Sequence, residues 1–337
     1  MSPQYVAGAV VALAVCVSAC NATAPSAPAL DGGWTSATSL PVPRFEGKSV
    51  VVNGDVLYIG GITGVINDQA SARESDRVDI YDPTKRTWTS GPPLPADAPR
   101  HHLALAVLDG RVYVLGGFTG IIGGADAAGV FTPSAATFVL DGTTWQRLAD
   151  QPVARGSATA EVIGGLIYVA GGGVAEPDSR TDLYVYDPAS DTWAMRRPMP
   201  TSREHVASCV VAGRMIVLGG WQGNDKHVVA AAESYDPTTD QWTHLADMPT
   251  ARGGLGAVAV NGVCFAVGGE QWVGPLPATF PNVEALDLDS GLWTTAGPMH
   301  TARHGLGVAA VGDEIYAVGG GPVQGNSYTD VVEVHRP

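Results

Sequence analysis

The sequence predicts an all-β protein built from six copies of one four-stranded unit. Three features recur with the copies: a Gly-Gly pair, an arginine sixteen residues before the pair, and a tryptophan. The pairs begin at Gly60, Gly116, Gly171, Gly219, Gly268 and Gly319, and the arginines are Arg44, Arg100, Arg155, Arg203, Arg252 and Arg303. The tryptophans are Trp34, Trp88, Trp145, Trp193, Trp242 and Trp293. An offset that recurs six times without change indicates a repeat protein.

Each copy contains signals for four strands. Two short apolar runs lie between the arginine and the Gly-Gly pair, and in the second copy they flank the turn Asp109-Gly110, which is typical of a β-hairpin. A third run ends in Tyr-Asp-Pro in three copies, and a fourth begins at the tryptophan. The tryptophan follows an aromatic or apolar residue by seven positions, at Tyr81, Phe138, Tyr186, Tyr235 and Leu286. One copy is therefore expected to form a blade of a β-propeller.

The order Gly-Gly, Tyr-Asp, Trp at these spacings resembles the Kelch repeat, and the resemblance covers residues 33–337. It implies a six-bladed Kelch β-propeller. The last copy ends at Pro337 without a tryptophan, three residues after Val334, which we align with Tyr186. We therefore expect the N-terminal strand, which carries Trp34, to complete the last blade and close the ring. The repeated tryptophans are expected to anchor neighbouring blades.

The N-terminus differs from the repeats in composition. Residues 6–15 are apolar and are followed by Val-Ser-Ala-Cys, ending at Cys20, which resembles the bacterial lipobox. The resemblance implies a lipoprotein signal peptide at residues 1–19 and a lipid on Cys20. Residues 20–32 are rich in Ala and Pro, as in a flexible tether, and the rest forms one propeller domain. The alternative is a further apolar strand, which the propeller does not need.

These features predict a protein that is secreted across the inner membrane and held by its lipid in the cell envelope, in the periplasm or on the outer cell surface. The net charge of −14 argues against nucleic acid as a partner, because phosphates require a basic surface. It also argues against binding to acidic lipids, so the membrane is contacted only through the N-terminal lipid. We expect a monomer.

Motifs for common chemistry are missing from the sequence. Hydrolytic triads, phosphate-binding loops and metalloprotease helices have no match. Copper radical oxidases related to galactose oxidase also contain Kelch blades, but no tyrosine here precedes a histidine. Cys209 and Cys264 lie in apolar runs of different copies, and we expect buried free thiols there in place of a disulfide. The Asp-rich turns, such as 187–191, are interpreted as Asx turns and not as calcium sites. We expect no cofactor.

The resemblance implies that the innermost strand of each blade starts near the mouth of a central channel. The six arginines at the start of these strands are therefore expected to form an outward-facing ring. Other candidate residues at the same end are Glu46, His101, His102, Glu204, His205, His304, Trp221 and Trp272. Long segments after the first two Gly-Gly pairs, Ile62 to Arg77 and Phe118 to Ala135, are candidate loops over this mouth.

The first hypothesis is a membrane-tethered extracytoplasmic binding module. The arginine ring would attract an anionic glycan, a sugar acid or an acidic peptide, and Trp221 and Trp272 would stack on sugar rings. The alternative is structural, with the arginines tying neighbouring blades together through backbone carbonyls or carboxylates. His102, His205 and His304 belong to alternate copies, as ligands of one metal could, but their positions within the copies differ. No metal is assigned.

Two further functions stay open. The architecture resembles the six-bladed Kelch mutarotase of sialic acid from bacterial periplasms, and that resemblance implies an acid and a base, Glu204 or Glu46 with His205 or His102. No catalytic motif supports it beyond the architecture. A scaffold that assembles cell-envelope proteins would use the same face, with broad loops in place of a pocket.

Overall fold

The computed structural model describes residues 33–65, 68–121, 131–174, 179–223, 227–272 and 278–337. Every regular element in these ranges is a β-strand. They contain no helix with the length and apolar character needed to cross a membrane. The fold is therefore all-β, as the sequence predicts.

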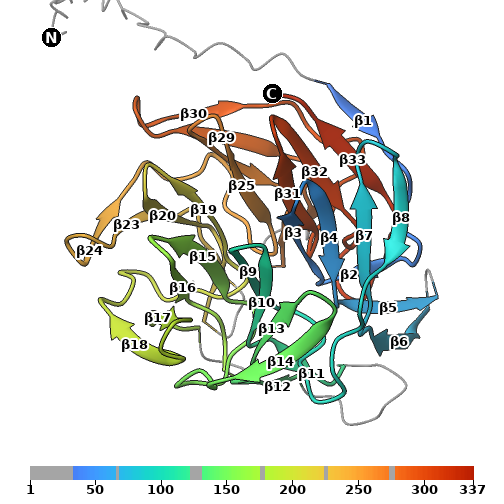
Figure 1. The fold of residues 1–337 in the computed structure, drawn as a ribbon. Coiled ribbons are helices and arrows are strands. Elements are labelled where there is room, and N and C mark those ends of the chain that lie inside the picture. The colour runs from blue at the N-terminus through green and yellow to red at the C-terminus, as the bar shows by residue number, and fades with distance from the viewer. Residues whose placement is uncertain (1–32, 66–67, 122–130, 175–178, 224–226, 273–277) are drawn as a thin grey trace, which may run out of the picture.

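Six antiparallel sheets of four strands make up most of the described chain (Figure 1). The first is β3 (Lys48–Val52), β4 (Asp55–Ile59), β7 (Val78–Asp82) and β8 (Thr87–Ser90). The second is β9 (Ala104–Leu108), β10 (Arg111–Leu115), β13 (Thr137–Asp141) and β14 (Thr144–Leu148). The third is β15 (Thr159–Ile163), β16 (Leu166–Ala170), β17 (Leu183–Asp187) and β18 (Thr192–Arg196).

The remaining three sheets repeat this order. The fourth is β19 (Ala207–Val211), β20 (Arg214–Leu218), β23 (Ala232–Asp236) and β24 (Gln241–His244). The fifth is β25 (Gly256–Val260), β26 (Val263–Val267), β29 (Val283–Asp287) and β30 (Leu292–Thr295). The sixth is β31 (Gly307–Val311), β32 (Glu314–Val318), β33 (Val332–His335) and, from the other end of the chain, β1 (Trp34–Ser36).

Short strands follow four of the Gly-Gly pairs and form small ribbons, to the first of which β2 is added from before the pair. They are β2 (Arg44–Phe45) with β5 (Ile62–Val65) and β6 (Asp68–Glu74), β11 (Phe118–Thr119) with β12 (Thr132–Pro133), β21 (Trp221–Gln222) with β22 (His227–Val228), and β27 (Glu270–Gln271) with β28 (Ala278–Thr279). The segment from Ile62 to Arg77, expected to be an irregular loop, is thus largely a hairpin. In the other expected loop, residues 122–130 lie outside the described chain.

The sixth sheet joins the two ends of the chain. Trp34 in β1 pairs with His335 in β33, and the two rings stack with centroids 5.0 Å apart. His335, and not Val334 as expected, is therefore the equivalent of Tyr186, which pairs with Trp193 in the third sheet. The position assigned to Phe138 is also wrong, because Leu140 is the residue that pairs with Trp145. In this second copy the turn between β13 and β14 is shorter than the corresponding turns, so the tryptophan follows its partner by five residues and not by seven.

The first strand of each sheet lies innermost (Figure 1). These six strands contact one another in sequence, from β3 through β9, β15, β19 and β25 to β31, and β31 contacts β3 again. All six contribute to the lining of one cavity of about 410 Å³. Apolar side chains such as Leu57, Val114 and Phe138 fill the space between adjacent sheets.

Backbone hydrogen bonds connect the start of each innermost strand to the next. The residue two positions after each repeat arginine donates its N–H to the equivalent carbonyl of the preceding copy, and we call this set the inner circuit. Its bonds are Glu46 to Gly305 (2.7 Å), His102 to Glu46 (2.9 Å), Ser157 to His102 (3.0 Å), His205 to Ser157 (3.0 Å), Gly254 to His205 (2.9 Å) and Gly305 to Gly254 (2.8 Å). The last bond returns to the first copy.

A second set, the glycine circuit, explains the Gly-Gly pairs. The second glycine of each pair donates its N–H to the carbonyl of the arginine in the next copy: Gly61 to Arg100, Gly117 to Arg155, Gly172 to Arg203, Gly220 to Arg252, Gly269 to Arg303 and Gly320 to Arg44, over 2.6–2.9 Å. Gly171 and Gly172 have φ of +67° and +93°, which side chains disfavour. A Cβ on Gly171 would also lie 2.7 Å from the Arg203 oxygen, so the pair must be glycine.

The repeat tryptophans form a third set, the tryptophan circuit. Each indole N–H donates to a carbonyl in the segment that ends the preceding copy: Trp34 to Gly297 (3.3 Å), Trp88 to Thr38 (2.9 Å), Trp145 to Pro92 (3.1 Å), Trp193 to Ala149 (3.0 Å), Trp242 to Arg197 (2.8 Å) and Trp293 to Ala246 (2.8 Å). The tryptophans therefore anchor neighbouring copies, as expected.

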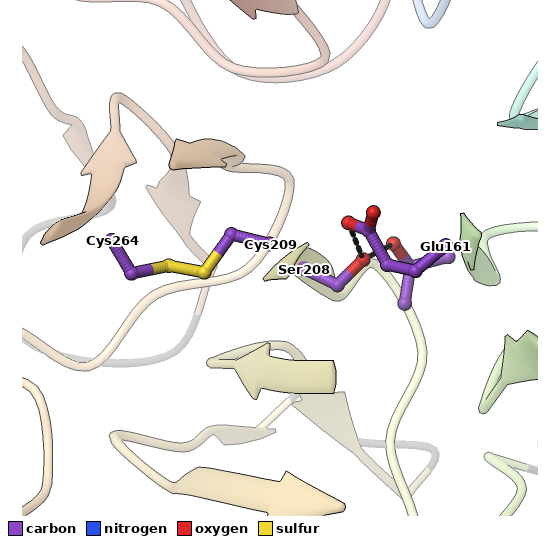
Figure 2. Close-up of a disulfide and its surroundings, with 5 residues drawn as sticks. Glu161, Ser208, Cys209 and Cys264 are labelled. Carbon is purple, nitrogen blue, oxygen red and sulfur yellow. Dashed lines mark hydrogen bonds between the residues drawn. A yellow bond between two sulfur atoms is a disulfide. The ribbon is translucent and has the colours of Figure 1, made fainter. Parts of the chain in front are cut away.

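A disulfide joins two neighbouring sheets (Figure 2). It links Cys209 in β19 to Cys264 in β26, with Cα atoms 6.2 Å apart. The expectation of free thiols is wrong. Both cysteines lie in apolar strands that pack face to face in one cluster, and this contact between sheets is not visible in the spacing of cysteines along the sequence.

Candidate functional site

The repeat arginines do not face outward. Arg44, Arg155, Arg203, Arg252 and Arg303 are each 0% exposed. Each side chain donates to the carbonyl of the first glycine of its own copy, which follows sixteen residues later in the chain. Arg203, for example, donates to the Gly219 carbonyl over 2.9 Å. The prediction of an outward-facing ring is therefore wrong for these five, because backbone carbonyls and carboxylates already surround their guanidinium groups.

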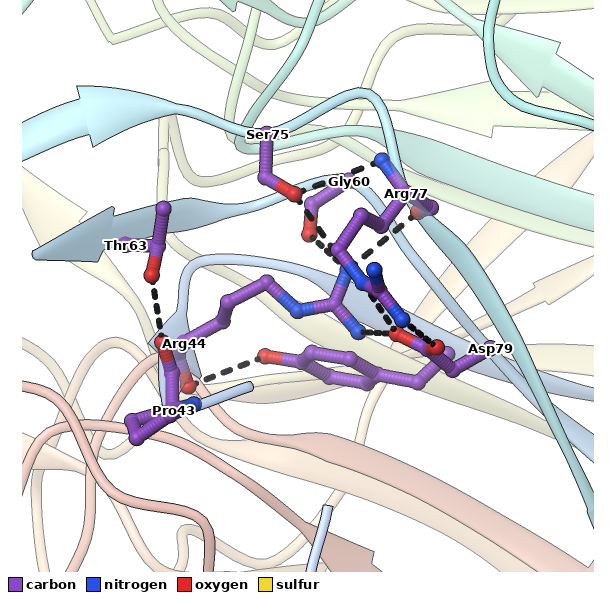
Figure 3. Close-up of polar contacts among 8 residues, drawn as sticks. Pro43, Arg44, Gly60, Thr63, Ser75, Arg77 and Asp79 are labelled. Atoms are coloured by element: carbon purple, nitrogen blue, oxygen red, sulfur yellow. Dashed lines mark hydrogen bonds and ion pairs between the residues drawn. The ribbon is translucent and has the colours of Figure 1, made fainter. Parts of the chain in front are cut away.

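A carboxylate on the third strand of the sheet neutralises most of these arginines. The pairs are Arg44 with Asp79, Arg203 with Glu233 (2.6 Å), Arg252 with Glu284 (2.5 Å) and Arg303 with Glu333 (3.0 Å). Figure 3 shows Arg44 between the Gly60 carbonyl and Asp79. Burial lowers the pKa of Arg203, and the charge of Glu233 offsets part of this effect. In these four sheets the buried arginine therefore has an internal, structural role.

Arg100 differs because its copy has no such carboxylate. Strand pairing places Phe138 at the equivalent position of β13. The Arg100 guanidinium is partly exposed and donates to the carbonyls of Leu94 (3.3 Å) and Ala96 (3.2 Å). Arg155 is intermediate, since Tyr184 lies at that position, 5.0 Å below its guanidinium carbon, and Asp182 is 3.8 Å away.

A compact polar cluster lies on the inner circuit. Glu46, His102 and His205 bring one ligand atom each within 4.8 Å of the others. Glu46 Oε2 is 3.4 Å from His102 Nε2, and Ser157 Oγ, also on the inner circuit, is 3.5 Å from His205 Nε2. Glu46 and His102 are only 3% and 4% exposed. We call Glu46, His102, Ser157 and His205 the mouth cluster.

The backbone of the mouth cluster is strained. Glu46, His102, Ser157 and His205 have φ of +56°, +53°, +57° and +52°, a region where side chains cost free energy. The fifth and sixth copies place Gly254 and Gly305 at the equivalent positions. Glycine adopts this positive φ without strain, yet four of the six copies have a polar side chain at this position.

Electrostatics in the mouth cluster follow from burial. Burial raises the pKa of Glu46, while His304 and Lys48 lower it. Burial lowers the pKa of His101 to about 4 and that of His102 well below its usual range. These two histidines are therefore neutral near pH 7.

The remaining predicted site residues surround this cluster. His304 donates from Nδ1 to the Gly321 carbonyl (3.0 Å) and lies 3.7 Å from Glu270. Glu204 Oε2 is 3.9 Å from His205 Nδ1. Trp221 is 4% exposed, with His205 stacked on it at 3.8 Å between centroids, so that face is not open to a sugar ring. Trp272 is partly exposed and contacts Trp221 edge to face.

Aromatic side chains enclose one side of the mouth cluster. Phe118 and Phe131 stack on each other and contact both His101 and His102. Phe45, Ile62, Ala72, Ile121 and Tyr328 form an adjoining apolar cluster drawn from the first, second and last copies. The mouth cluster is therefore shielded from bulk water on this side.

Inside the cavity, a carboxyl group was not anticipated from the sequence. Glu161 in β15 accepts a hydrogen bond from Ser208 Oγ (2.7 Å), and Ser208 also contacts Thr159 (2.5 Å); Figure 2 shows Glu161 with Ser208. Burial raises the pKa of Glu161 to about 7. A charged residue in the middle of an innermost strand was the signal that could have indicated it.

Comparison with known proteins agrees with this architecture. Residues 119–320 match the KLHDC2/KLHL20/DRC7 Kelch-repeats domain, and residues 43–95 match the Kelch motif. The chain belongs to the Kelch-repeat family. A solved structure titled "Structure of YjhT" superposes with a TM-score of 0.73 over 88% of this chain and 96% of that chain, at 16% identity, and this likeness concerns the fold alone.

Curated relatives share the repeats. Kelch-like protein terF of Aspergillus terreus is 27% identical over 99% of this chain and 74% of its own length. Kelch-like protein 35 of Mus musculus is 28% identical over 58% of this chain and 29% of its own length. A Kelch repeat-containing protein of Arabidopsis thaliana, At3g27220, is 29% identical over 58% of this chain and 45% of its own length. The chain thus spans less than half of the last two.

Replacement of Arg203 by Met is expected to lower the free energy of unfolding by about 3–5 kcal/mol, because Glu233 would stay buried without its partner. Urea unfolding followed by tryptophan fluorescence measures this. Arg100→Met is the matched control, with an expected loss below about 1 kcal/mol. Equal losses in the two variants would contradict the internal role of Arg203.

Glu161→Gln is expected to remove a pH dependence of stability. The pKa of Glu161 is raised from 4.5 to about 7 in the folded chain, so its contribution to stability falls as pH rises between these values. At pH 8 the variant should be more stable than the parent by roughly 1–3 kcal/mol. At pH 4 the two should unfold at similar urea concentrations, and a difference that does not change with pH would contradict the assignment.

Proposed function

We propose that the chain is an exported six-bladed Kelch propeller, closed by its N-terminal strand, that binds a protein partner at the end carrying the Gly-Gly pairs. The three hydrogen-bond circuits support a closed ring, since each returns to the copy from which it starts. Kelch-repeat proteins typically mediate contacts between proteins, and this chain shares their repeats.

The proposal rests on one observation: the connecting segments differ in length between copies mainly at one end of the sheets. The end with the Gly-Gly pairs carries the ribbons β5–β6, β11–β12, β21–β22 and β27–β28, which differ in length. The opposite end carries short turns, such as those between β3 and β4 and between β9 and β10. A rigid scaffold whose variable segments gather at one end is typical of a recognition surface.

The arginine ring no longer supports an anionic glycan, a sugar acid or an acidic peptide as the ligand. Five guanidinium groups are buried, and four of these are paired with a carboxylate at 3.0 Å or less. The chain also carries a net charge of −14. We therefore favour a scaffold function over capture of an anion.

The mutarotase alternative also loses support. Glu46 and His102 are 3% and 4% exposed, and Phe118 and Phe131 lie against His102. A general acid or base must come within hydrogen-bond distance of the substrate. Groups this deeply enclosed do not favour proton transfer to a sugar ring.

We also propose that the chain is lipid-anchored in the cell envelope. The supporting structural observation is the disulfide between Cys209 and Cys264, because disulfides persist in oxidising compartments outside the cytosol. The signal peptide, Cys20 and the tether lie outside the described residues, so the anchor rests on the sequence.

An exposed apolar residue at the Gly-Gly end tests the binding surface. Val323, after the last Gly-Gly pair, is 60% exposed, and Leu292 on the outer strand β30 is 52% exposed. We expect Val323→Asp to weaken partner binding at least about tenfold, because a charge would be buried in the contact, and Leu292→Asp to leave it unchanged. Partners are identified by cross-linking in envelope membranes, and affinities are then measured with the purified pair. Loss of binding in Leu292→Asp alone would place the surface on the outer rim instead.

Cys20→Ala protein is expected to move from the detergent phase to the aqueous phase of Triton X-114, because no other lipid attachment is proposed. Cys16→Ala, a change within the signal peptide, is the control and should stay in the detergent phase. Retention of Cys20→Ala protein in detergent would rule out the anchor.

A further inference from the structure

We propose that Glu46, His102 and His205 form a binding site for one divalent transition-metal ion, such as Zn²⁺, at the centre of the inner circuit. This proposal does not depend on the protein-binding function. Two imidazoles and one carboxylate are a donor set that suits Zn²⁺, with a further position left for water or for Ser157. Each of the three residues comes from a different copy, so the ring brings together ligands that are far apart in sequence.

The distances fit a shared ion. Ligand atoms about 2.0–2.1 Å from a tetrahedral ion lie roughly 3.4 Å from one another, and Glu46 Oε2 is 3.4 Å from His102 Nε2. This separation is long for a hydrogen bond. The ligand atom of the third residue, His205, lies within 4.8 Å of those of Glu46 and His102.

A chain of hydrogen bonds sets the tautomer of His102. His101 Nε2 lies 2.8 Å from the Gly120 carbonyl, which only accepts, so this nitrogen carries a proton. Two Nδ1 atoms 2.6 Å apart need one donor and one acceptor; with one proton on each ring, His101 Nδ1 is bare and accepts from His102 Nδ1. Neutral His102 then presents a bare Nε2 to Glu46. A metal-binding histidine typically donates its other ring N–H in this way.

The strained backbone is an independent argument for the site. Glu46, His102 and His205 hold large side chains at φ near +55°, where Gly254 and Gly305 show that glycine is sufficient. Strain of this kind tends to persist where the side chain has a function. The ligand positions coincide with these strained positions.

Metal binding is tested on untagged protein treated with a chelator and then titrated with Co²⁺ and Zn²⁺. We expect one ion per chain, with a Co²⁺ visible spectrum of a four-coordinate site. Glu46→Gln and His205→Gly should bind at least about 100-fold more weakly by calorimetry. His205→Gly copies the residue found in the fifth and sixth copies, so it should keep the thermal midpoint of the parent protein.

His244, 62% exposed beside Asp247, supplies the control: His244→Ala should bind Co²⁺ like the parent. Two results would overturn the proposal. One is a parent protein that takes up no Co²⁺ at stoichiometric concentration. The other is equal affinity in the parent, Glu46→Gln and His205→Gly, which would place the ion elsewhere.

Discussion

The whole structure depends on hydrogen bonds between the backbone of one copy and that of the next. In the glycine circuit, the second glycine of a pair donates to the carbonyl of the following arginine. The side chain of a buried arginine, in turn, donates to the first glycine of the Gly-Gly pair in its own copy, as Arg203 does to Gly219. Backbone and side chain of one residue thus hold two adjacent copies together. This double role accounts for the offset of sixteen residues in the five copies whose arginine is buried; Arg100 keeps the offset, but its side chain donates to Leu94 and Ala96 instead.

The sequence was sufficient to predict the sheets but not the role of the arginines. Gly-Gly pairs, turns and tryptophans are local signals, and they located the strands and the anchors between copies. The partners Asp79, Glu233 and Glu284 lie on the third strand, at distances from their arginines that vary with the length of the intervening ribbon. A repeat pattern in the sequence cannot show whether such an arginine points inward or outward.

Similar limits explain the other differences. Because the turn in the second copy is shorter, the spacing of seven assigned Phe138 to the position that Leu140 occupies. That assignment concealed the absence of a carboxylate beside Arg100. The disulfide escaped detection because Cys209 and Cys264 approach only when two sheets pack. By contrast, Glu46, His102 and His205 were all singled out from the sequence, because each follows a repeat arginine by two residues.

The pairing of β1 with β33 has a consequence for the order of events during folding. The outermost strand of the sixth sheet, β1, precedes every other described strand in the chain, and its partner β33 follows all of them. Until residues 332–335 exist, β1 has no strand to pair with, and the sixth sheet cannot form. The sheet that joins these two distant segments therefore forms late, when every other described sheet already has all of its strands.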